Sequence, residues 1–595
     1  MSINIKIKHK WIMCMAVFCY FSGSLLIAQY LDRQLTLVRP YDPSVMEAQK
    51  ITTLPNLRDS FSIKPSFLYS IESKRIDTRF DVTPITPARV GALPQTKLYH
   101  GYIKVGAGIL PSALAEVAIN TVRNKDYALG AILKFDGAGG KVKLENDEKV
   151  YAGYNDLSVK TFGQKFFRNN SILYGELGAL AQTAYNYGYD TEVFVGDGER
   201  IIPNFSNDEL RKQYVFADAN IGIRSSHFKT NQLNYDVKMD YKFVYNRLGE
   251  EYLPNYLPDD LNSEDYANFY ENAFNFKTQL DNNMFGGNLN LDVFNRSNAF
   301  DSLRNNFALD INPWFMLDND SIRMKIGMRV AAYSEDREGE SNLQYGIYPV
   351  IEFQFTLLKD IFIPFIGIDG YLRPNKYRSI IEDNPFINPA LAVPVSNTKW
   401  QIYAGLKGNL LSKLSYYFRA DFYTTENEHF FVNDTDFSRV QNYFTVVTDK
   451  NVNTVNLKSE LYFNPTQSVD FGVKANYFKY QTTDLEKAWH KPGFTLDFFA
   501  KYNLRNKIIT NLDVMYVGKR YAKKFFDPDK PDGIADISDF YELNSAIAFN
   551  IGGEYRYTKS FSFFVRFNLT TPTYQRWNFY PSHRFNAMLG FTYSL

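Results

Sequence analysis

The chain has 595 residues, and its 66 basic side chains are balanced by 65 acidic ones, which leaves a net charge of +1. It therefore lacks the basic excess expected of a nucleic-acid-binding protein. Aromatic residues make up 16% of the chain while the mean hydropathy is only −0.33, a combination that fits a barrel with an apolar outside and a polar inside.

Residues 1–28 have the pattern of a cleavable export signal. Three lysines precede an apolar stretch over 11–27, and the small residue Ala28 follows it. This order is typical of a signal peptide, and the apolar run is shorter than the roughly 20 residues of a spanning helix. The alternative is a single N-terminal membrane anchor. Because Cys14 and Cys19 both lie in this segment, the exported chain is expected to contain no disulfide and no cysteine nucleophile.

Residues 29–96 are predicted to form a proline-rich extension, either in the periplasm or inside the barrel. The segment contains seven prolines, which are Pro40, Pro43, Pro55, Pro65, Pro84, Pro87 and Pro94. Because proline cannot donate to a sheet ladder, we expect extended chain here. A short helix over about 43–51 is the exception, since Asp42 and Pro43 suit its start.

Residues 97–595 show apolar and polar side chains in alternation. Apolar side chains occupy every second position from Leu233 to Tyr245, and most positions between them are charged or amide. Successive side chains of a strand point to opposite faces. Similar stripes occur over 215–223, 322–332, 400–406, 469–477, 494–502 and 561–569. Soluble β-sandwiches and propellers are the alternative, but their strands are usually shorter, whereas long alternating stripes suit a bilayer crossing.

The connections between these stripes alternate in length. Tight turns are expected near Thr230, Asn282, Asn319, Lys359, Ser412, Pro465, Asn506 and Lys559. Longer polar loops are expected over 184–212, 248–267, 297–302, 335–343, 374–396, 426–451, 481–491, 522–540 and 571–582. Outer-membrane barrels have short periplasmic turns and long outside loops. The sequence therefore predicts an all-β fold, a transmembrane antiparallel up-and-down β-barrel of about 22 strands with both ends in the periplasm.

Two further features refine this prediction. Segments 428–432 and 442–448 are expected to form a hairpin within one outer loop. The final strand alternates apolar and polar side chains up to Phe591, Tyr593 and Leu595. Such a strand looks like the signal that the outer-membrane barrel-insertion machinery reads, although the usual last residue of that signal is phenylalanine.

Two stretches resemble known membrane barrels. The last one contains Phe-Val-Arg-Phe-Asn-Leu at 564–569 and Tyr-Gln-Arg-Trp at 574–577, and it resembles the final hairpin of TonB-dependent-receptor-like barrels of the Bacteroidota. Val-Arg-Pro-Tyr-Asp-Pro at 38–43 resembles the lead-in of a plug-less set of such barrels. The resemblance implies an outer-membrane barrel with the strand count of TonB-dependent transporters. It departs from those transporters because residues 30–96 leave no room for their plug domain and contain no TonB box.

Motifs that carry chemistry are weak. The sequence contains no His-Glu-x-x-His, Gly-x-Ser-x-Gly or Walker motif. One loop resembles a calcium loop in its four aspartates, Asp527, Asp529, Asp532 and Asp536. Pro531 stands where the EF-hand pattern has an acid or amide, so a solvated outer loop is the favoured interpretation. We predict no enzyme activity and no cofactor, and we interpret Asp236, Asp240 and Glu460 as ordinary lumenal charges.

The sequence thus predicts a protein of the Gram-negative outer membrane, in contact with lipid, lipopolysaccharide, the insertion machinery and other outer-membrane or periplasmic proteins. A barrel this wide needs a plug, folded-in loops or a bound partner. The first hypothesis is a scaffold or accessory subunit of an outer-membrane assembly or transport complex. The alternative is a porin-like or TonB-receptor-like channel for solute uptake, and an outer-membrane enzyme is the third.

Overall fold

The computed structural model describes most of the chain from Leu98 to the C-terminus. The described residues are 98–144, 147–188, 193–195, 199–201, 206–207, 210–226, 232–247, 268–282, 284–298, 301–337, 340–388, 391, 393–411, 413–434, 443–525, 539–571 and 574–595. The expected export signal over 1–28 and the proline-rich extension over 29–96 lie outside them, so both remain predictions.

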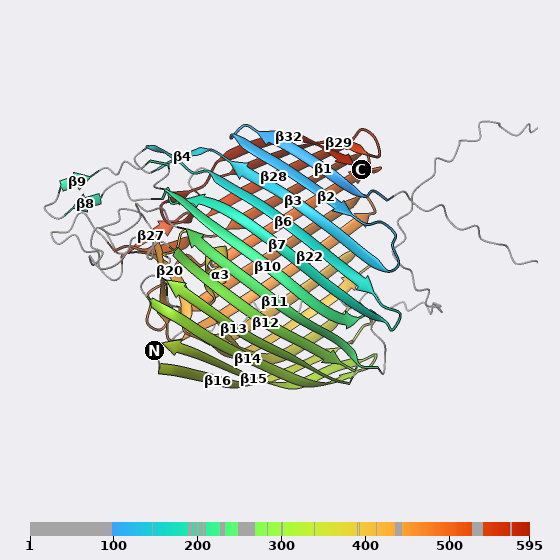
Figure 1. Cartoon of the computed structure of the whole chain (residues 1–595). Coiled ribbons are helices and arrows are strands. Elements are labelled where there is room, and N and C mark those ends of the chain that lie inside the picture. The colour runs from blue at the N-terminus through green and yellow to red at the C-terminus, as the bar shows by residue number, and fades with distance from the viewer. Residues whose placement is uncertain are drawn as a thin grey trace, which may run out of the picture. The chain divides into compact units, whose positions relative to one another are not determined.

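Twenty-two antiparallel strands form one closed barrel (Figure 1). The strands are β1 (Gly101–Gly108), β2 (Ser112–Asn120), β3 (Tyr127–Ala138), β6 (Tyr154–Phe166), β7 (Ser171–Tyr185), β10 (Arg211–Ser225), β11 (Asn234–Arg247), β12 (Asn268–Asp281), β13 (Phe285–Asn298), β14 (Asp301–Asp318), β15 (Ile322–Arg337), β16 (Glu340–Phe355), β17 (Ile363–Arg373), β18 (Ser396–Leu410), β19 (Leu414–Glu426), β22 (Val452–Thr466), β23 (Val469–Gln481), β24 (Phe494–Leu504), β25 (Ile508–Val517), β28 (Ala546–Arg556), β29 (Phe561–Thr570) and β32 (Phe585–Ser594). Each pairs with the next in this order, and β1 pairs with β32, which closes the wall. The predicted fold class and strand count are confirmed.

The remaining elements belong to the connections. Five hairpins stand apart from the wall in the part of the chain that the structure describes. They are β4 (Lys141–Lys143) with β5 (Lys149–Tyr151), β8 (Val193–Val195) with β9 (Glu199–Ile201), β20 (Glu428–Asn433) with β21 (Phe444–Asp449), β26 (Arg520–Lys523) with β27 (Phe540–Leu543), and β30 (Gln575–Trp577) with β31 (Tyr580–Pro581). The β20–β21 pair confirms the hairpin predicted within a loop.

The hairpins with a labelled strand in Figure 1, which are those of β4, β8, β20 and β27, lie at one end of the barrel, on the left; we call it the loop end. The short helix α3 (Tyr377–Asp383) lies on the same side. No helix among the described residues combines the length and the hydropathy needed to cross a bilayer.

The barrel wall has an apolar outer face and a polar inner face. On β11, Met239 is 59% exposed on the outside, whereas its neighbour Asp240 is 8% exposed and lies on the inside. Asp240 is paired there with Lys238 at 2.6 Å. The alternation confirms the period of two predicted from the sequence. It fits strands that face lipid on one side and a polar lumen on the other.

The exposure of Met239 leads to a first prediction. Replacing Met239 by arginine would place a cation in the apolar outer belt, which costs about 2–4 kcal/mol near the bilayer midplane. We expect the free energy of unfolding in lipid to fall by that amount. The matched control is Asn220→Arg, because Asn220 lies on the lumenal face opposite Asp240. Equal losses in the two variants would contradict the assignment of the faces.

Candidate functional site

The connection between β17 and β18 folds into the lumen, and we call its residues 374–395 the closing loop. The loop leaves the wall at β17 but binds the inner face of β10 to β13, past the three strands in between. Arg378 of α3 forms a bidentate ion pair with Asp218 of β10, with nitrogen–oxygen distances of 2.7 and 3.0 Å. A two-point Arg–carboxylate contact fixes orientation as well as position. The pair therefore holds α3 against a wall strand distant in sequence.

Two further wall carboxylates hold the start of α3. The helix has no side-chain cap of its own at Lys376. Instead the buried Glu271 carboxylate on β12 accepts hydrogen bonds from the backbone N–H groups of Tyr377 at 2.7 Å and Arg378 at 3.2 Å. These first-turn donors have no partner within a helix. The Lys376 ammonium also forms an ion pair with Asp292 on β13. The barrel wall thus caps a helix that would be too short to be stable alone.

The second half of the closing loop is tied to β10. The Lys212 ammonium donates to the backbone carbonyl of Ile387 at 2.6 Å. The hydroxyl of Tyr214 donates to the carbonyl of Pro385, also at 2.6 Å. Both side chains are fully buried. Carbonyl groups that the irregular loop leaves without ladder partners are satisfied in this way by the wall.

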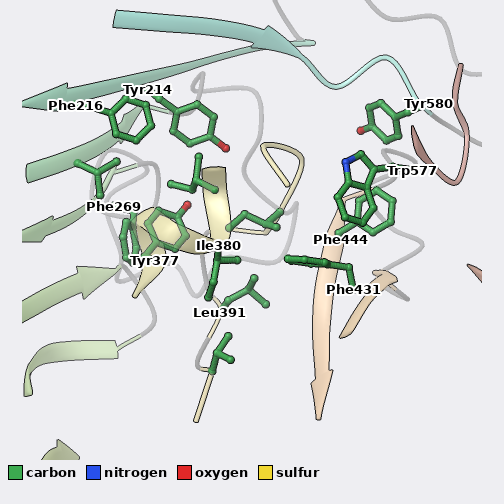
Figure 2. Packing of buried hydrophobic residues seen from close by; sticks show 14 residues of the cluster. Tyr214, Phe216, Phe269, Tyr377, Ile380, Leu391, Phe431, Phe444, Trp577 and Tyr580 are labelled. Atoms are coloured by element: carbon green, nitrogen blue, oxygen red, sulfur yellow. The ribbon is translucent and has the colours of Figure 1, made fainter. Parts of the chain in front are cut away.

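An apolar cluster forms where the closing loop meets two other loops (Figure 2). Its members come from the wall, the closing loop, the β20–β21 hairpin and the β30–β31 segment. They are Tyr214, Phe216, Val244, Phe269, Tyr377, Ile380, Ile381, Ile387, Leu391, Val393, Phe431, Phe444, Trp577 and Tyr580. Ring centroids lie 3.7 Å apart for Phe269 and Tyr377, and 5.1 Å apart for Phe431 and Trp577. Loops that leave the wall at different strands therefore share one buried apolar core at the loop end.

His490 lies in the connection between β23 and β24, and its ring links this connection to the β20–β21 hairpin and to the β30–β31 segment. Its Nδ1 lies 2.9 Å from the carbonyl oxygen of Phe431, and its Nε2 accepts from the backbone N–H of Asn578 at 3.3 Å. A carbonyl can only accept, so Nδ1 carries the proton and the ring is neutral. Burial is the main cause that lowers the pKa of His490 to about 3, and the nearby Arg520 guanidinium contributes to the same shift. The ring acts as a fixed polar bridge inside an apolar cluster.

The carboxylate of Asp449 connects the β20–β21 hairpin to a neighbouring loop through backbone hydrogen bonds. Asp449 is fully buried and ends the β20–β21 hairpin. It accepts backbone hydrogen bonds from Asn451, Thr483, Asp484 and Leu485, at distances between 2.8 and 3.1 Å. Charge-assisted bonds of this kind are stronger than neutral ones. The hairpin and the 481–493 loop are thereby joined.

This geometry predicts a local loss of stability. In Asp449→Ala the four N–H groups lose their acceptor, and an unsatisfied buried donor costs about 1–3 kcal/mol. We expect hydrogen exchange at 483–485 to become at least tenfold faster, while amides of β11 and β12 keep their protection. The control is Glu486→Ala, because the Glu486 side chain is exposed in the same loop. Unchanged exchange in Asp449→Ala would contradict this role.

The other sequence-predicted residues do not form a site. The aspartates Asp527, Asp529, Asp532 and Asp536 lie outside the described residues, so the calcium loop remains untested. Among the residues that the structure describes, no cluster of three metal-binding side chains occurs. The three lumenal carboxylates each have their own partner: Asp236 accepts from Tyr174, Asp240 pairs with Lys238, and Glu460 pairs with Lys458. They are separate structural contacts.

The proposed insertion signal occupies the end of the last strand and the C-terminus. Phe591 and Tyr593 of β32 and the terminal residue Leu595 are all partly exposed. In the wall, Phe591 faces Val105 and Tyr593 faces Ile103 of β1. Their apolar alternation is present in the folded strand, and their recognition by the insertion machinery remains a prediction.

Sequence reasoning did not identify the anchors of the closing loop. Asp218, Glu271 and Asp292 look like ordinary lumenal charges, because only the folded chain brings them to the closing loop. A usable signal was the apolar pair Ile380 and Ile381 inside a segment expected to be a polar loop. Both are 2% exposed. Buried apolar residues in a long loop point to a packed position.

Comparison with known proteins finds a likeness of fold. No known family profile matches the chain, and no curated protein sequence matches it. Among solved structures, the FrpB iron transporter from Neisseria meningitidis (F3-3 variant) aligns with a TM-score of 0.61 at 8% identity, over 84% of this chain and 82% of that one.

Two further solved structures have a similar fold. The ferripyoverdine receptor of the outer membrane of Pseudomonas aeruginosa has a TM-score of 0.61 at 11% identity, over 84% of this chain and 72% of the receptor. The copper transporter OprC has a TM-score of 0.55 at 10% identity, over 83% and 80% of the two chains. At these identities the likeness is one of fold.

Proposed function

We propose that this protein is a solute-uptake channel of the outer membrane, built on a TonB-receptor-like barrel and obstructed at its loop end by its own loops. The observation that carries the proposal is the closing loop. It is bound to four consecutive wall strands, β10 through Asp218 and two buried donors, β11 through Asn246, β12 through Glu271 and β13 through Asp292. A loop bound to the inner wall at these points supports a path through the lumen that is narrowed and controlled.

The scaffold role, which the sequence put first, becomes the second candidate. The similar solved structures are named as iron and copper transporters and as a receptor bound to ferripyoverdine. That similarity favours the uptake alternative over the scaffold. The apolar outer belt supports an outer-membrane location, and lipid, lipopolysaccharide and neighbouring outer-membrane proteins are the expected contacts of that belt and of the loop end. The periplasmic placement of both chain ends also remains a proposal.

Uptake by whole cells tests the proposal. The full chain is expressed in a porin-deficient Gram-negative host, and accumulation of radiolabelled organic acids and oligosaccharides of graded size is compared with an empty vector. We expect faster uptake of a subset of these solutes. Uptake equal to the vector for every solute, with other outer-membrane proteins co-purifying at fixed stoichiometry, would instead support the scaffold.

A further inference from the structure

A cavity of about 780 Å³ lies at the loop end, apart from the apolar cluster. Its walls come from β4 and the turn after it, from β27, and from the stretch that runs from β30 to the start of β32. Ligand sites for small molecules commonly span about 300–1,000 Å³. The cavity therefore has room for a small organic molecule, and nothing in the mechanism proposed above uses it.

The walls of this cavity are held in place by hydrogen bonds and ring contacts. The ring Nε2 of His583 lies 3.0 Å from the carbonyl oxygen of Ala152, next to the β4–β5 hairpin. Gln575 accepts from the backbone N–H of Phe579 at 3.0 Å. The rings of Tyr541 and Phe579 meet edge to face with centroids 5.6 Å apart. A site that is formed before its ligand arrives loses less entropy on binding.

Among the described residues, the lining of the cavity contains three basic side chains, Lys141, Lys143 and Arg584, and two acidic ones, Asp147 and Glu542. Of its acidic residues, Asp147 is paired with Lys143 at 2.8 Å, and Glu542 is paired with Lys519. Lys141 and Arg584 also line the cavity, and neither side chain has a carboxylate partner among the described residues. In the described part of the chain, these two cations thus line the same cavity as the rings of Tyr541 and Phe579.

We propose that this cavity binds a small organic anion, with a carboxylate or phosphate group held by Lys141 and Arg584 and an apolar or aromatic body against Tyr541 and Phe579. The arginine fork matches either anionic group through two parallel hydrogen bonds, and the lysine adds a point charge. Capture of such an anion for uptake rests on the function proposed above, whereas binding itself does not.

Equilibrium dialysis of the full chain in nanodiscs tests the binding. The probes are 1-naphthyl phosphate and 1-naphthoate, and neutral 1-naphthol reports partition into lipid. We expect saturable binding of at least one anion and none of naphthol beyond that of empty nanodiscs. The two anions distinguish phosphate from carboxylate recognition. Loss of one charge-assisted contact is expected to weaken binding about tenfold.

The variants are Lys141→Gln, Arg584→Gln and their combination. Both side chains are exposed, so the barrel is expected to fold in each variant, and circular dichroism checks this. Lys450→Gln removes an exposed cation of the loop end outside the cavity and is the matched control. The absence of saturable binding, or an affinity that falls no further in the double variant than in Lys450→Gln, overturns the proposal. Dialysis measures binding and not transport. A negative uptake assay therefore does not decide the binding proposal, and a negative dialysis result does not decide the uptake proposal.

Discussion

Deleting residues 376–393 and joining the ends through a short glycine–serine linker is expected to open the barrel to ions. The deleted segment carries every wall contact of α3 and the second half of the closing loop, including the Arg378–Asp218 pair. It also contributes Tyr377, Ile380 and Ile381 to the apolar cluster. Without these side chains, the remaining loops lose their shared core. A barrel of this width then has no inner obstruction at that position.

Single-channel recording in planar bilayers measures the effect. We expect stable steps of conductance several-fold above the full chain, together with higher sensitivity of expressing cells to large antibiotics. The wall itself should survive, because its ladder from β1 to β32 contains no residue of the loop. The matched control is Glu382→Gln, since the Glu382 carboxylate is exposed and, among the described residues, pairs with Arg378 and not with the wall. A deletion variant with the conductance of the full chain would show that this loop does not obstruct the lumen.

A single substitution distinguishes the effect of the Arg378–Asp218 contact on conductance from the effect of removing the whole loop. Arg378→Ala leaves the loop in place but removes the bidentate contact to Asp218. Removing one partner leaves the carboxylate partly buried without its counter-ion, which is costly. Brief, flickering openings are the expected result, between the behaviour of the full chain and that of the deletion. This ordering ties conductance to the wall contact.

The barrel could be predicted from the sequence, because each part of the prediction rested on local pattern. A period of two along β11 requires only that Met239 and Asp240 face opposite sides. Alternating lengths of connections require only that strands run antiparallel. Both patterns depend on residues that are close together in the sequence, so a single sequence is enough to recognise them.

The candidate site could not be predicted, because it depends on contacts between distant segments. Arg378 and Asp218 are separated by 160 positions, and His490 and Asn578 by 88. In the sequence, each of these residues is one polar group among many. Only the closed wall decides which lumenal carboxylate faces the closing loop. The scaffold hypothesis ranked first in the sequence because residues 30–96 leave no room for a plug domain and contain no TonB box.

Acid is expected to loosen the loop end while leaving the wall intact. His490 is held neutral at the junction of three loops, and burial lowers its pKa from 6.5 to about 3. His429 on β20 behaves alike: burial lowers its pKa to about 3, and Lys491 and Arg373 add to the effect. Because both pKa values in the closed structure lie below 6.5, each ring stabilises the closed loops fully above pH 6.5. That stability is lost as the pH falls from 6.5 toward 3.

The expected loss at pH 5 is about 2 kcal/mol for each histidine. Hydrogen exchange of the β20–β21 hairpin, corrected for the intrinsic pH dependence, measures it at pH 7 and pH 5. Protection should fall in the hairpin and in the 481–493 loop, and should hold in β11 and β12. His490→Gln can keep a donor and an acceptor without a titrating ring, so with His429→Gln it should remove most of the difference. If the double variant still opens at pH 5, groups other than these two histidines control the closure.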